Sequence, residues 1–523
     1  MALVLFTSIF AAAAVLVDSE WPHIFFDWTV TYSRRAPLGV DKQAFSKSTL
    51  LFNFDFCMNG VQLRRNSWQD GVQETNCPIS PGQNWTYSFQ IKDQIGSFFY
   101  FPSILLHKAA GGYGAIRVRN RDNVPVPFAQ PYQEFDILIG DWFNADHRTM
   151  RASLDEGNSL PIPDGILING VGPNQAIFDF ELGAIYRLRI SNVGLKTCLN
   201  FRIEDHLMLL VETEGSYTVQ QYYSSLDIHV GQSYSVLVTA KEQAYNGLSY
   251  YMVASSRFTA LELFGVGIIR YPDSEVDRFG LLPAGPPPYD YEFSVDQARS
   301  IRWNLSTGAA RPNPQGSYHY GSINISRTLV LENGFMYEGS RLRYTINGVS
   351  FVHPDTPLKL ADYFQLNDEF TSVSFPDSPI NNSTLPTLGT SVIDANYRDF
   401  VHIVFVNPQQ HVQTWHIDGY NFFVVGMEWG PWNESKMATY NMVDAVSRST
   451  VQVYPSSWTA ILTDLDNQGM WNLRSQYAEN WYLGQELYIR VKGVGEEDPS
   501  TIPARDEAPI PVNIIKCGRA KSL

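Results

Sequence analysis

The stretch Tyr186-Arg-Leu-Arg-Ile190 alternates apolar and polar side chains, which is the period-two pattern of a β-strand with one buried face and one face in water. The same alternation occurs at Tyr234–Thr239, at Leu487–Lys492 and around Arg117. Long amphipathic helices are scarce, and a short helix is expected only near Ser294–Arg302. Because antiparallel sandwiches are built from such strands, we expect an all-β chain whose interleaved arginines face solvent.

Length, composition and charge narrow the class of protein. The chain has 523 residues, of which 44% are hydrophobic and 14% aromatic, enough for about three domains at ~100–200 residues each. Its net charge of −15 makes nucleic acid an unsuitable partner. We place the domains at 21–125, 130–275 and 326–495, with a proline-rich linker at 281–325 and a tail at 496–523.

The N-terminus predicts secretion. Leu3–Val17 is apolar and rich in alanine but shorter than the ~20 residues of a membrane span, so residues 1–19 are interpreted as a signal peptide. No later stretch reaches spanning length, and the polar C-terminus argues against a lipid anchor. Six Asn-x-Ser/Thr sequons predict a secreted glycoprotein. They are Asn84, Asn304, Asn324, Asn381, Asn382 and Asn433.

Three blocks carry a resemblance to known proteins: Cys57-Met-Asn-Gly-Val-Gln62, Gly96-Ser-Phe-Phe-Tyr-Phe-Pro-Ser103 and Trp415-His-Ile-Asp-Gly-Tyr-Asn-Phe-Phe423. Together they resemble the multicopper oxidases. The wording of residues 59–71 and 92–103 is similar to the plant SKU-similar (skewed-growth) family, which includes pollen-specific ascorbate oxidase homologues. The resemblance covers nearly the whole chain. It implies three cupredoxin-like, Greek-key β-sandwich domains and a location in the cell wall or apoplast.

The resemblance also identifies the positions at which active copper oxidases hold their metal. The His-Trp-His-Gly motif of those enzymes is matched here by Cys57-Met-Asn-Gly60, and their Tyr-His-x-His motif by Tyr100-Phe-Pro-Ser103. Only one of the matched positions, residue 416, keeps a histidine. The degenerate copper-ligand positions are Cys57, Asn59, Phe101, Ser103, Gln413, His416, Asp418, Arg474, Ser475, Gln476, Asn480 and Gln485.

The inventory of donor residues leads to the same expectation without the family. A blue copper site needs a thiolate and two imidazoles, and Cys198 is the one cysteine with a histidine, His206, within ten residues. Histidines two apart share a strand face, yet the closest pair among the ten histidines is five apart. We therefore expect no catalytic residue, no bound metal and no cofactor. The alternative is a residual copper-dependent oxidoreductase that acts on ascorbate or phenolics.

Single residues allow a structural and a functional interpretation. His416 is expected to be a hydrogen-bonded core residue rather than a lone ligand, Asp418 a turn residue rather than a cleft carboxylate, and Cys198 a buried thiol rather than a nucleophile. Phe101 is expected to fill space that imidazoles occupy in active relatives. Arg64 and Arg65 beside Trp68 form either an ordinary ion pair or a patch that binds sugars and carboxylates.

The four cysteines contain no Cys-x-x-Cys motif, and spacing alone leaves three pairings open. The resemblance implies a disulfide between Cys77 and Cys517, which would tie the first domain to the tail, and leaves Cys57 and Cys198 unassigned. It also implies that the first domain is about two dozen residues short near 43–57. Such a loss would remove an edge or central strand and expose ladder groups.

The overall expectation is a secreted protein of the copper oxidase fold with a non-enzymatic role in the wall, such as directional or pollen-tube growth. Its partner would be a wall polysaccharide or a wall protein. A wall-polysaccharide binding module is the remaining alternative.

Overall fold

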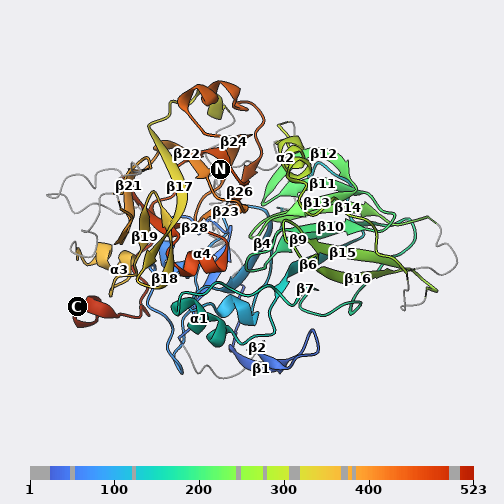
Figure 1. Cartoon of the computed structure of the whole chain (residues 1–523), viewed down its shortest axis with the longest axis horizontal. Coiled ribbons are helices and arrows are strands. Elements are labelled where there is room, and N and C mark those ends of the chain that lie inside the picture. The colour runs from blue at the N-terminus through green and yellow to red at the C-terminus, as the bar shows by residue number, and fades with distance from the viewer. Residues whose placement is uncertain are drawn as a thin grey trace, which may run out of the picture.

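The computed structural model describes residues 24–46, 53–92, 94–120, 125–242, 249–274, 280–305, 319–366, 375–379, 385–493 and 507–523. Most of their regular structure is β-strand, arranged in six sheets. In Figure 1 the green strands lie at the right, the yellow-to-red strands lie at the left and top, and a blue hairpin lies at the bottom. The expected signal peptide and the sequons at Asn381 and Asn382 fall outside the described residues.

The first domain has the smallest sheets. A two-stranded sheet pairs β1 (Thr31–Arg35) with β2 (Lys42–Ser46), and a three-stranded antiparallel sheet has the order β3 (Phe56–Asn59), β4 (Gly96–Pro102) and β5 (Gly114–Val118). Two short 3₁₀ helices accompany them, η1 (Ser67–Gln69) and η2 (His107–Ala110). The described residues of this domain contain five strands. The domain packs against both larger domains, through β4 on the second domain and through η1 on the third.

The second domain is a two-sheet sandwich around one hydrophobic core. Its six-stranded sheet has the order β12 (Ser216–Tyr223), β11 (Met208–Thr213), β14 (Ser233–Thr239), β9 (Ile185–Asn192), β6 (Gln133–Trp142), β7 (Gly165–Ile168). Its five-stranded sheet has the order β13 (Ser225–Ile228), β10 (Leu199–Ile203), β15 (Tyr250–Ser256), β16 (Phe264–Arg270), β8 (Ala176–Asp179). Helix α1 (His147–Asp155) follows β6 and is capped by Asp146, whose carboxylate accepts from the Arg148 amide.

The third domain is also a two-sheet sandwich. One sheet has the order β20 (Thr387–Gly389), β19 (Val349–Phe351), β18 (Arg341–Ile346), β17 (Arg327–Glu338), β22 (Phe400–Asn407), β27 (Ser457–Asp464), β24 (Phe422–Trp429), β25 (Ser447–Arg448). The other has the order β21 (Val392–Asn396), β29 (Glu486–Lys492), β28 (Gly469–Ser475), β23 (Gln413–Ile417), β26 (Thr450–Val453). The remaining described helices are α2 (Tyr291–Ser300), α3 (Leu358–Tyr363), α4 (Ala478–Tyr482), η3 (Tyr320–Ser322), η5 (Glu434–Thr439) and η6 (Gly518–Ser522).

Helix α2 is the short helix that the sequence predicts, although it begins three residues earlier. Asp290 accepts from the Phe293 amide at 3.0 Å and caps its N-terminus.

One expectation about the strands is wrong. Arg187 and Arg189 of β9 do not face solvent but are 5% and 4% exposed. The polar face of the six-stranded sheet packs against β4 of the first domain, where Arg189 donates to Ser97 Oγ at 2.8 Å. Arg187 pairs with Glu212 at 2.6 Å, so each buried charge has a partner. Alternation correctly predicted the strand, but the face that it left polar is an interface between domains.

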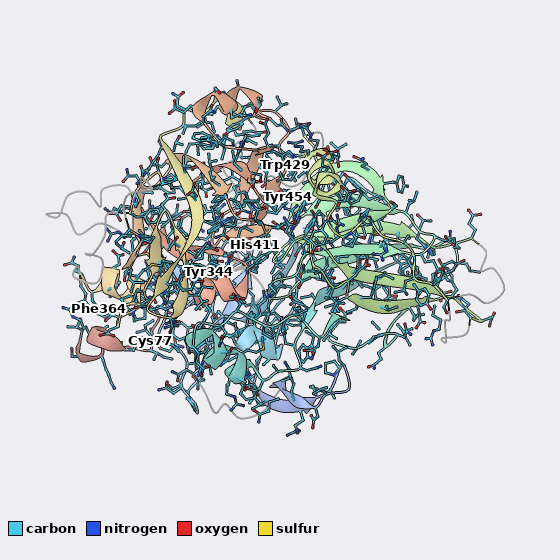
Figure 2. All side chains as sticks on the ribbon, in the orientation of Figure 1. Cys77, Tyr344, Phe364, His411, Trp429 and Tyr454 are labelled. Atoms are coloured by element: carbon cyan, nitrogen blue, oxygen red, sulfur yellow. A yellow bond between two sulfur atoms is a disulfide. The ribbon has the colours of Figure 1, made fainter. Side chains whose placement is uncertain are left out.

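The tail is attached to the body by the disulfide that the resemblance implies. Cys77 and Cys517 are joined across 440 residues of sequence, and Cys57 and Cys198 are free and buried. Figure 2 shows Cys77 and Phe364 close to the C-terminal segment at the left. None of the helices in the described ranges combines the length and the apolar character that crossing a membrane requires.

Candidate functional site

Three strands from two domains bring several degenerate ligand positions together. Cys57 lies on β3, His416 on β23 and Arg474 on β28, and the last two are directly paired across the ladder. Asp418 follows in the turn after β23. Four of the degenerate positions, Cys57, His416, Asp418 and Arg474, therefore converge on one centre. Together with Asp70 they form what we call the Arg474 cluster.

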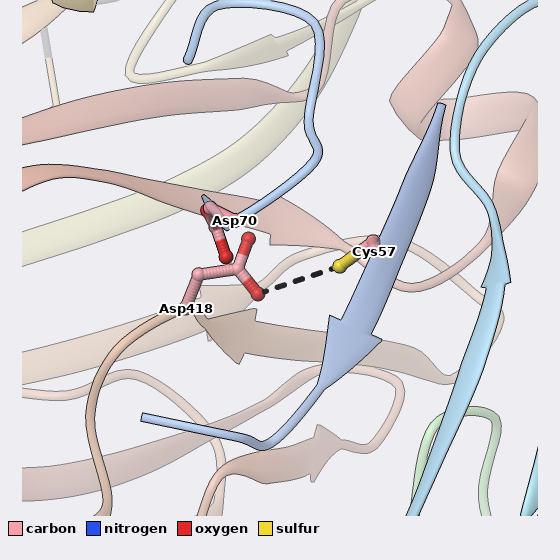
Figure 3. Close-up of side chains that lie close together, drawn as sticks. All are labelled: Cys57, Asp70 and Asp418. Carbon is pink, nitrogen blue, oxygen red and sulfur yellow. Dashed lines mark hydrogen bonds between the residues drawn. The ribbon is translucent and has the colours of Figure 1, made fainter. Parts of the chain in front are cut away.

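The guanidinium of Arg474 organises this centre. It donates to Asp418 Oδ2 through Nη1, and its Nη2 lies 3.4 Å from Cys57 Sγ. The Cys57 thiol also lies 3.9 Å from Asp418 Oδ1, the contact drawn in Figure 3. Each of these three residues is at most 2% exposed. The result is a buried ion pair with a thiol beside it.

His416 completes the hydrogen bonding of Asp418. Its Nε2 lies 2.9 Å from Asp418 Oδ1 and its Nδ1 lies 2.8 Å from Thr450 Oγ1. These partners fit a neutral ring with the proton on Nε2, which donates to the carboxylate and accepts from the hydroxyl. The expectation of a hydrogen-bonded core histidine is confirmed. Asp418 does stand in a turn, but it is a fully buried ion-pair partner.

The sequence interpretation missed Asp70. This carboxylate is 1% exposed, and one of its oxygens lies within 4.8 Å of ligand atoms of Cys57 and Asp418 (Figure 3). It belongs to the quoted block 59–71, directly before Gly71, whose φ of +70° makes a tight turn. Asp70 is itself part of the wording that resembles the family, so no departure from that wording could signal it.

Charge at this centre is balanced by protonation. Burial acts to raise the pKa of Asp418, but the charge of Arg474 and the hydrogen bond from His416 outweigh it and hold that pKa below its usual range. Burial, together with the charge of Asp418, raises the pKa of Asp70 and of the Cys57 thiol well above their usual ranges. Burial also lowers the pKa of His416. One anion therefore faces one cation, and the shifts favour the uncharged forms of the Asp70 carboxyl, the Cys57 thiol and the His416 ring around them.

A second group of degenerate positions forms a network of amides. Asn480 Nδ2 donates to Gln413 Oε1 at 3.1 Å and to Gln485 Oε1 at 2.9 Å. Ser475 lies at the end of β28, and its hydroxyl accepts from the Tyr477 amide at 3.2 Å. Gln413 in turn donates towards His411 Nε2 at 2.8 Å. The amides bond one another and the hydroxyl bonds the backbone, and none of these four positions supplies the soft sulfur that a blue copper site needs.

The remaining degenerate positions line the rim of the Arg474 cluster or lie outside it. Gln476 Nε2 donates to Asn59 Oδ1 at 2.7 Å. Phe101 pairs with Cys57 across the β3–β4 ladder and is 1% exposed, with Lys108 Nζ 4.6 Å above its ring. The Ser103 hydroxyl donates to the carbonyl of Gly71, the residue after Asp70, at 2.6 Å.

These residues do not fit copper. Copper oxidase sites need imidazoles and a thiolate, and in the described part of the chain His416 is the only imidazole in the cluster. A cation would have to displace the Arg474 guanidinium from Asp418 and deprotonate a thiol whose pKa is raised. Arg474 already compensates the charge of Asp418, and the raised pKa values of Cys57 and Asp70 favour their protonated forms.

Two further sequence hypotheses are resolved by burial. His206 bonds the Glu204 carbonyl and Tyr271 OH through its two ring nitrogens, at 2.6 and 2.7 Å, as a structural residue does. Arg64 pairs with Asp466 at 2.7 Å. Trp68 is 1% exposed and lies under the Lys359 ammonium, so its ring is not available to stack on a sugar. A sugar patch built on Arg64 and Trp68 is therefore wrong.

Among the described sequons, the asparagines at three positions are exposed and the one at Asn304 is half-buried. The exposed ones are Asn84, Asn324 and Asn433.

Comparisons with known proteins agree with this architecture. Three models of the multicopper oxidase family match residues 49–123, 133–274 and 355–496. The chain is 45% identical to the L-ascorbate oxidase homolog of Nicotiana tabacum over 99% of this chain and 98% of that protein. It is also 45% identical to the monocopper oxidase-like protein SKU5 of Arabidopsis thaliana, over 96% of this chain and 90% of that protein.

The fold is similar to solved multicopper oxidases. The structure of Fet3p, described as a multicopper oxidase that functions in iron import, superposes with a TM-score of 0.72 at 17% identity and covers 89% of both chains. The alignment with the tobacco protein extends over 552 residues, more than the 523 of this chain, so that relative carries residues without a counterpart here.

Proposed function

This chain belongs to the multicopper oxidase family, among relatives of the plant SKU5-like kind, and we propose that it acts in the cell wall or apoplast without copper-dependent oxidase chemistry. The observation that carries this proposal is the Arg474–Asp418 ion pair at the convergence of the family's ligand positions. A fixed guanidinium repels a metal cation at positions where the resemblance places copper ligands in the family's enzymes. The positive charge of Arg474 compensates the buried carboxylate of Asp418, as a bound metal cation would.

The amide network supports the same proposal. The resemblance places the thiolate of a blue copper site at position 475 and its imidazoles at 413 and 480, where Ser475, Gln413 and Asn480 stand. Because the three side chains form hydrogen bonds with one another or with the backbone, we interpret this group as a structural hydrogen-bond network. The three-domain scaffold of the family remains, and it suits a role in binding partners at the wall.

Metal analysis tests the proposal. The purified, secreted protein is dialysed against cupric ion, desalted, and measured for copper content, for absorption near the blue copper band, and for oxygen uptake with ascorbate and with a phenol. A copper-loaded ascorbate oxidase treated in parallel is the control. We expect less than one tenth of a copper per chain and no uptake above background. Stoichiometric copper, or uptake that a chelator stops and copper restores, would refute the proposal.

Secretion to the wall is the second component of the proposal. It rests on the N-terminal apolar segment, on the exposed sequons and on the kinship with plant proteins. A fluorescent fusion to the C-terminus should remain at the wall after plasmolysis, and the protein should lose mass on treatment with an N-glycosidase. Retention inside the cell with no glycan would contradict it.

A second candidate function, saccharide binding, is favoured by one groove. It has a volume of about 830 Å³ and lies between the β1–β2 hairpin, β5 and β6, within the ~300–1,000 Å³ range of ligand sites. Its lining includes the exposed Arg35 and the aromatic residues Tyr113 and Phe135. Guanidinium groups bind uronate carboxylates in a bidentate manner, so this groove replaces the buried Arg64–Trp68 pair as the place for an acidic sugar.

Calorimetry with an oligogalacturonide and with a neutral cello-oligosaccharide tests the groove. We expect the acidic oligosaccharide to bind and Arg35→Ala to weaken it at least tenfold. Arg34→Ala is the matched control, because Arg34 pairs with Asp41 and is not part of the lining. Absence of binding, or equal loss in both variants, would count against saccharide recognition here.

A further inference from the structure

A histidine lies between two buried glutamates that come from different domains. His353 follows β19 in the third domain, and its Nδ1 lies 2.8 Å from Glu74 Oε1 of the first domain. Its Nε2 lies 3.7 Å from Glu486 Oε1 on β29. Both glutamate side chains are 1% exposed, whereas the His353 side chain is 37% exposed. Protons can therefore reach the ring from solvent, while the carboxylates on either side are sealed.

Each glutamate keeps one oxygen without a hydrogen-bond partner among the described residues. Glu486 Oε2 accepts from Asn472 and Trp481, at 2.7 and 2.8 Å, but its Oε1 accepts no hydrogen bond. Glu74 Oε2 likewise lacks one. A buried carboxylate oxygen without a donor is costly. A second proton on the His353 ring would make Nε2 a donor, and this donor would face Glu486 Oε1.

The histidine stands at a junction of three chain segments. The carbonyl of Glu74 accepts from the Lys359 amide at 3.0 Å, which joins the 70–77 loop to α3. Three residues after Glu74, Cys77 is bonded to Cys517 of the tail. The tail in turn contacts the same third-domain segment, because the Arg519 amide donates to Thr356 Oγ1 at 2.9 Å. A change of charge at His353 acts on the joint between the first domain, the third domain and the tail.

We propose that His353 is a pH-sensitive latch between the first and third domains. When the ring is protonated it bridges Glu74 and Glu486; when it loses the proton it keeps one bond and releases the other. The joint is therefore tighter in weakly acidic surroundings and looser above neutral pH.

The charged groups around the ring favour this direction. Glu74 faces it from the 70–77 loop and Glu486 from β29, and both attract an imidazolium. Arg343 of β18 opposes it, but its guanidinium is directed to Ser350 Oγ and the Phe351 carbonyl, at 3.1 and 2.6 Å. Two carboxylates against one guanidinium leave the pocket short of one positive charge, which the protonated ring supplies.

The direction of the proton equilibria agrees. Burial acts to lower the pKa of His353, but the hydrogen bond to Glu74 and the charges of both glutamates outweigh it, so the pKa is raised. A histidine whose folded pKa is raised contributes stability that is complete below the unfolded value of ~6.5 and is lost as the pH rises through the folded value. Burial raises the pKa of Glu74, which also weakens the folded state as the pH rises above ~4.3. Both groups make the joint weaker at higher pH.

Hydrogen exchange of the joint tests the latch. Backbone exchange of segments 70–77 and 351–359 is followed by mass spectrometry at pH 5.5 and pH 8, after correction for intrinsic rates. In the natural protein we expect several-fold faster corrected exchange at pH 8, with tenfold per pH unit as the ceiling for one proton. His353→Gln and Glu74→Gln should each remove this difference. The exposed His319, mutated to Gln, is the matched control and should keep it.

A second measurement needs no variant. Deuterium exchange at the imidazole C2 position, read for each histidine-containing peptide, reports the pKa of each ring in the intact protein. We expect a His353 midpoint above ~6.5. A midpoint at or below that value, or a pH response of the joint that persists in His353→Gln, would overturn the proposal.

Discussion

Replacing Arg474 with methionine is the most informative single change in this protein. Methionine retains much of the side-chain length and removes the charge, which leaves the buried Asp418, 2% exposed, with the neutral His416 ring and the Cys57 thiol against its Oδ1. Breaking a buried ion pair in this way costs about 3–5 kcal/mol. At about 1.4 kcal/mol per factor of ten, that raises the opening equilibrium of the surrounding strands by roughly two to nearly four orders of magnitude.

Native-state hydrogen exchange of β28 is the appropriate assay, because a three-domain protein does not unfold in a single two-state step. Trp481 gives a second signal, since its ring lies 4.7 Å from the Arg474 guanidinium and its fluorescence will respond to the loss of the cation. The control is Arg302→Met, which breaks an exposed pair with Asp444 and should cost about 0.2–1 kcal/mol.

The double variant Arg474→Met with Asp418→Asn closes the cycle. If the single change destabilises the protein because it leaves a carboxylate uncompensated, neutralising Asp418 should recover most of the lost stability. Replacement of whole buried ion pairs often has this effect. A single variant that loses less than about 1 kcal/mol, or a double variant no more stable than the single one, would refute the charge-compensation argument.

Three more predictions follow from burial, chain topology and backbone geometry. Asp70→Asn should stabilise the protein more at pH 8 than at pH 5, because the pKa of Asp70 is raised in the folded state and its ionisation therefore destabilises that state as the pH rises above ~4. Melting temperatures of both proteins at the two pH values measure this, and an equal gain at both would contradict it. Replacing Cys77 and Cys517 together with serine should cost about 2–5 kcal/mol and release the tail to protease, which timed digestion detects; a tail that stays protected would count against the disulfide as its anchor. Gly71→Ala should prevent correct folding of the first domain, because a Cβ there would lie 1.7 Å from the Phe56 carbonyl oxygen at a φ of +70°; a soluble variant with natural circular dichroism and unchanged β3 exchange would refute this.

The strands and the family could be predicted from the sequence because both depend on local features. Alternation at β9, β14 and β29 reflects a two-residue period that any sandwich strand must follow. The pairing of Cys77 with Cys517 came from the resemblance, since spacing allowed three pairings, and the structure contains it. The degenerate positions could also be named, because the resemblance matches them to the ligand motifs of the copper oxidases.

The partners of those positions could not be predicted. Arg474 and Cys57 are 417 residues apart, and their contact at 3.4 Å exists only because β28 and β3 of different domains are packed together. Asp70 became part of the cluster for the same reason. Trp68 showed the reverse: a residue suited to sugar stacking was covered by the third domain's Lys359.

The sequence by itself determined a β-rich chain of three copper oxidase domains with one imidazole left among its ligand positions, because residue types and strand periods are properties of the chain alone. Tertiary structure alone decided which buried charges meet. It placed a cation where positions matched to the family's copper ligands converge, turned the arginine face of β9 into an interface, and set His353 between glutamates of two domains. Electrostatic energy depends on distance and burial, and neither quantity exists until the domains have packed.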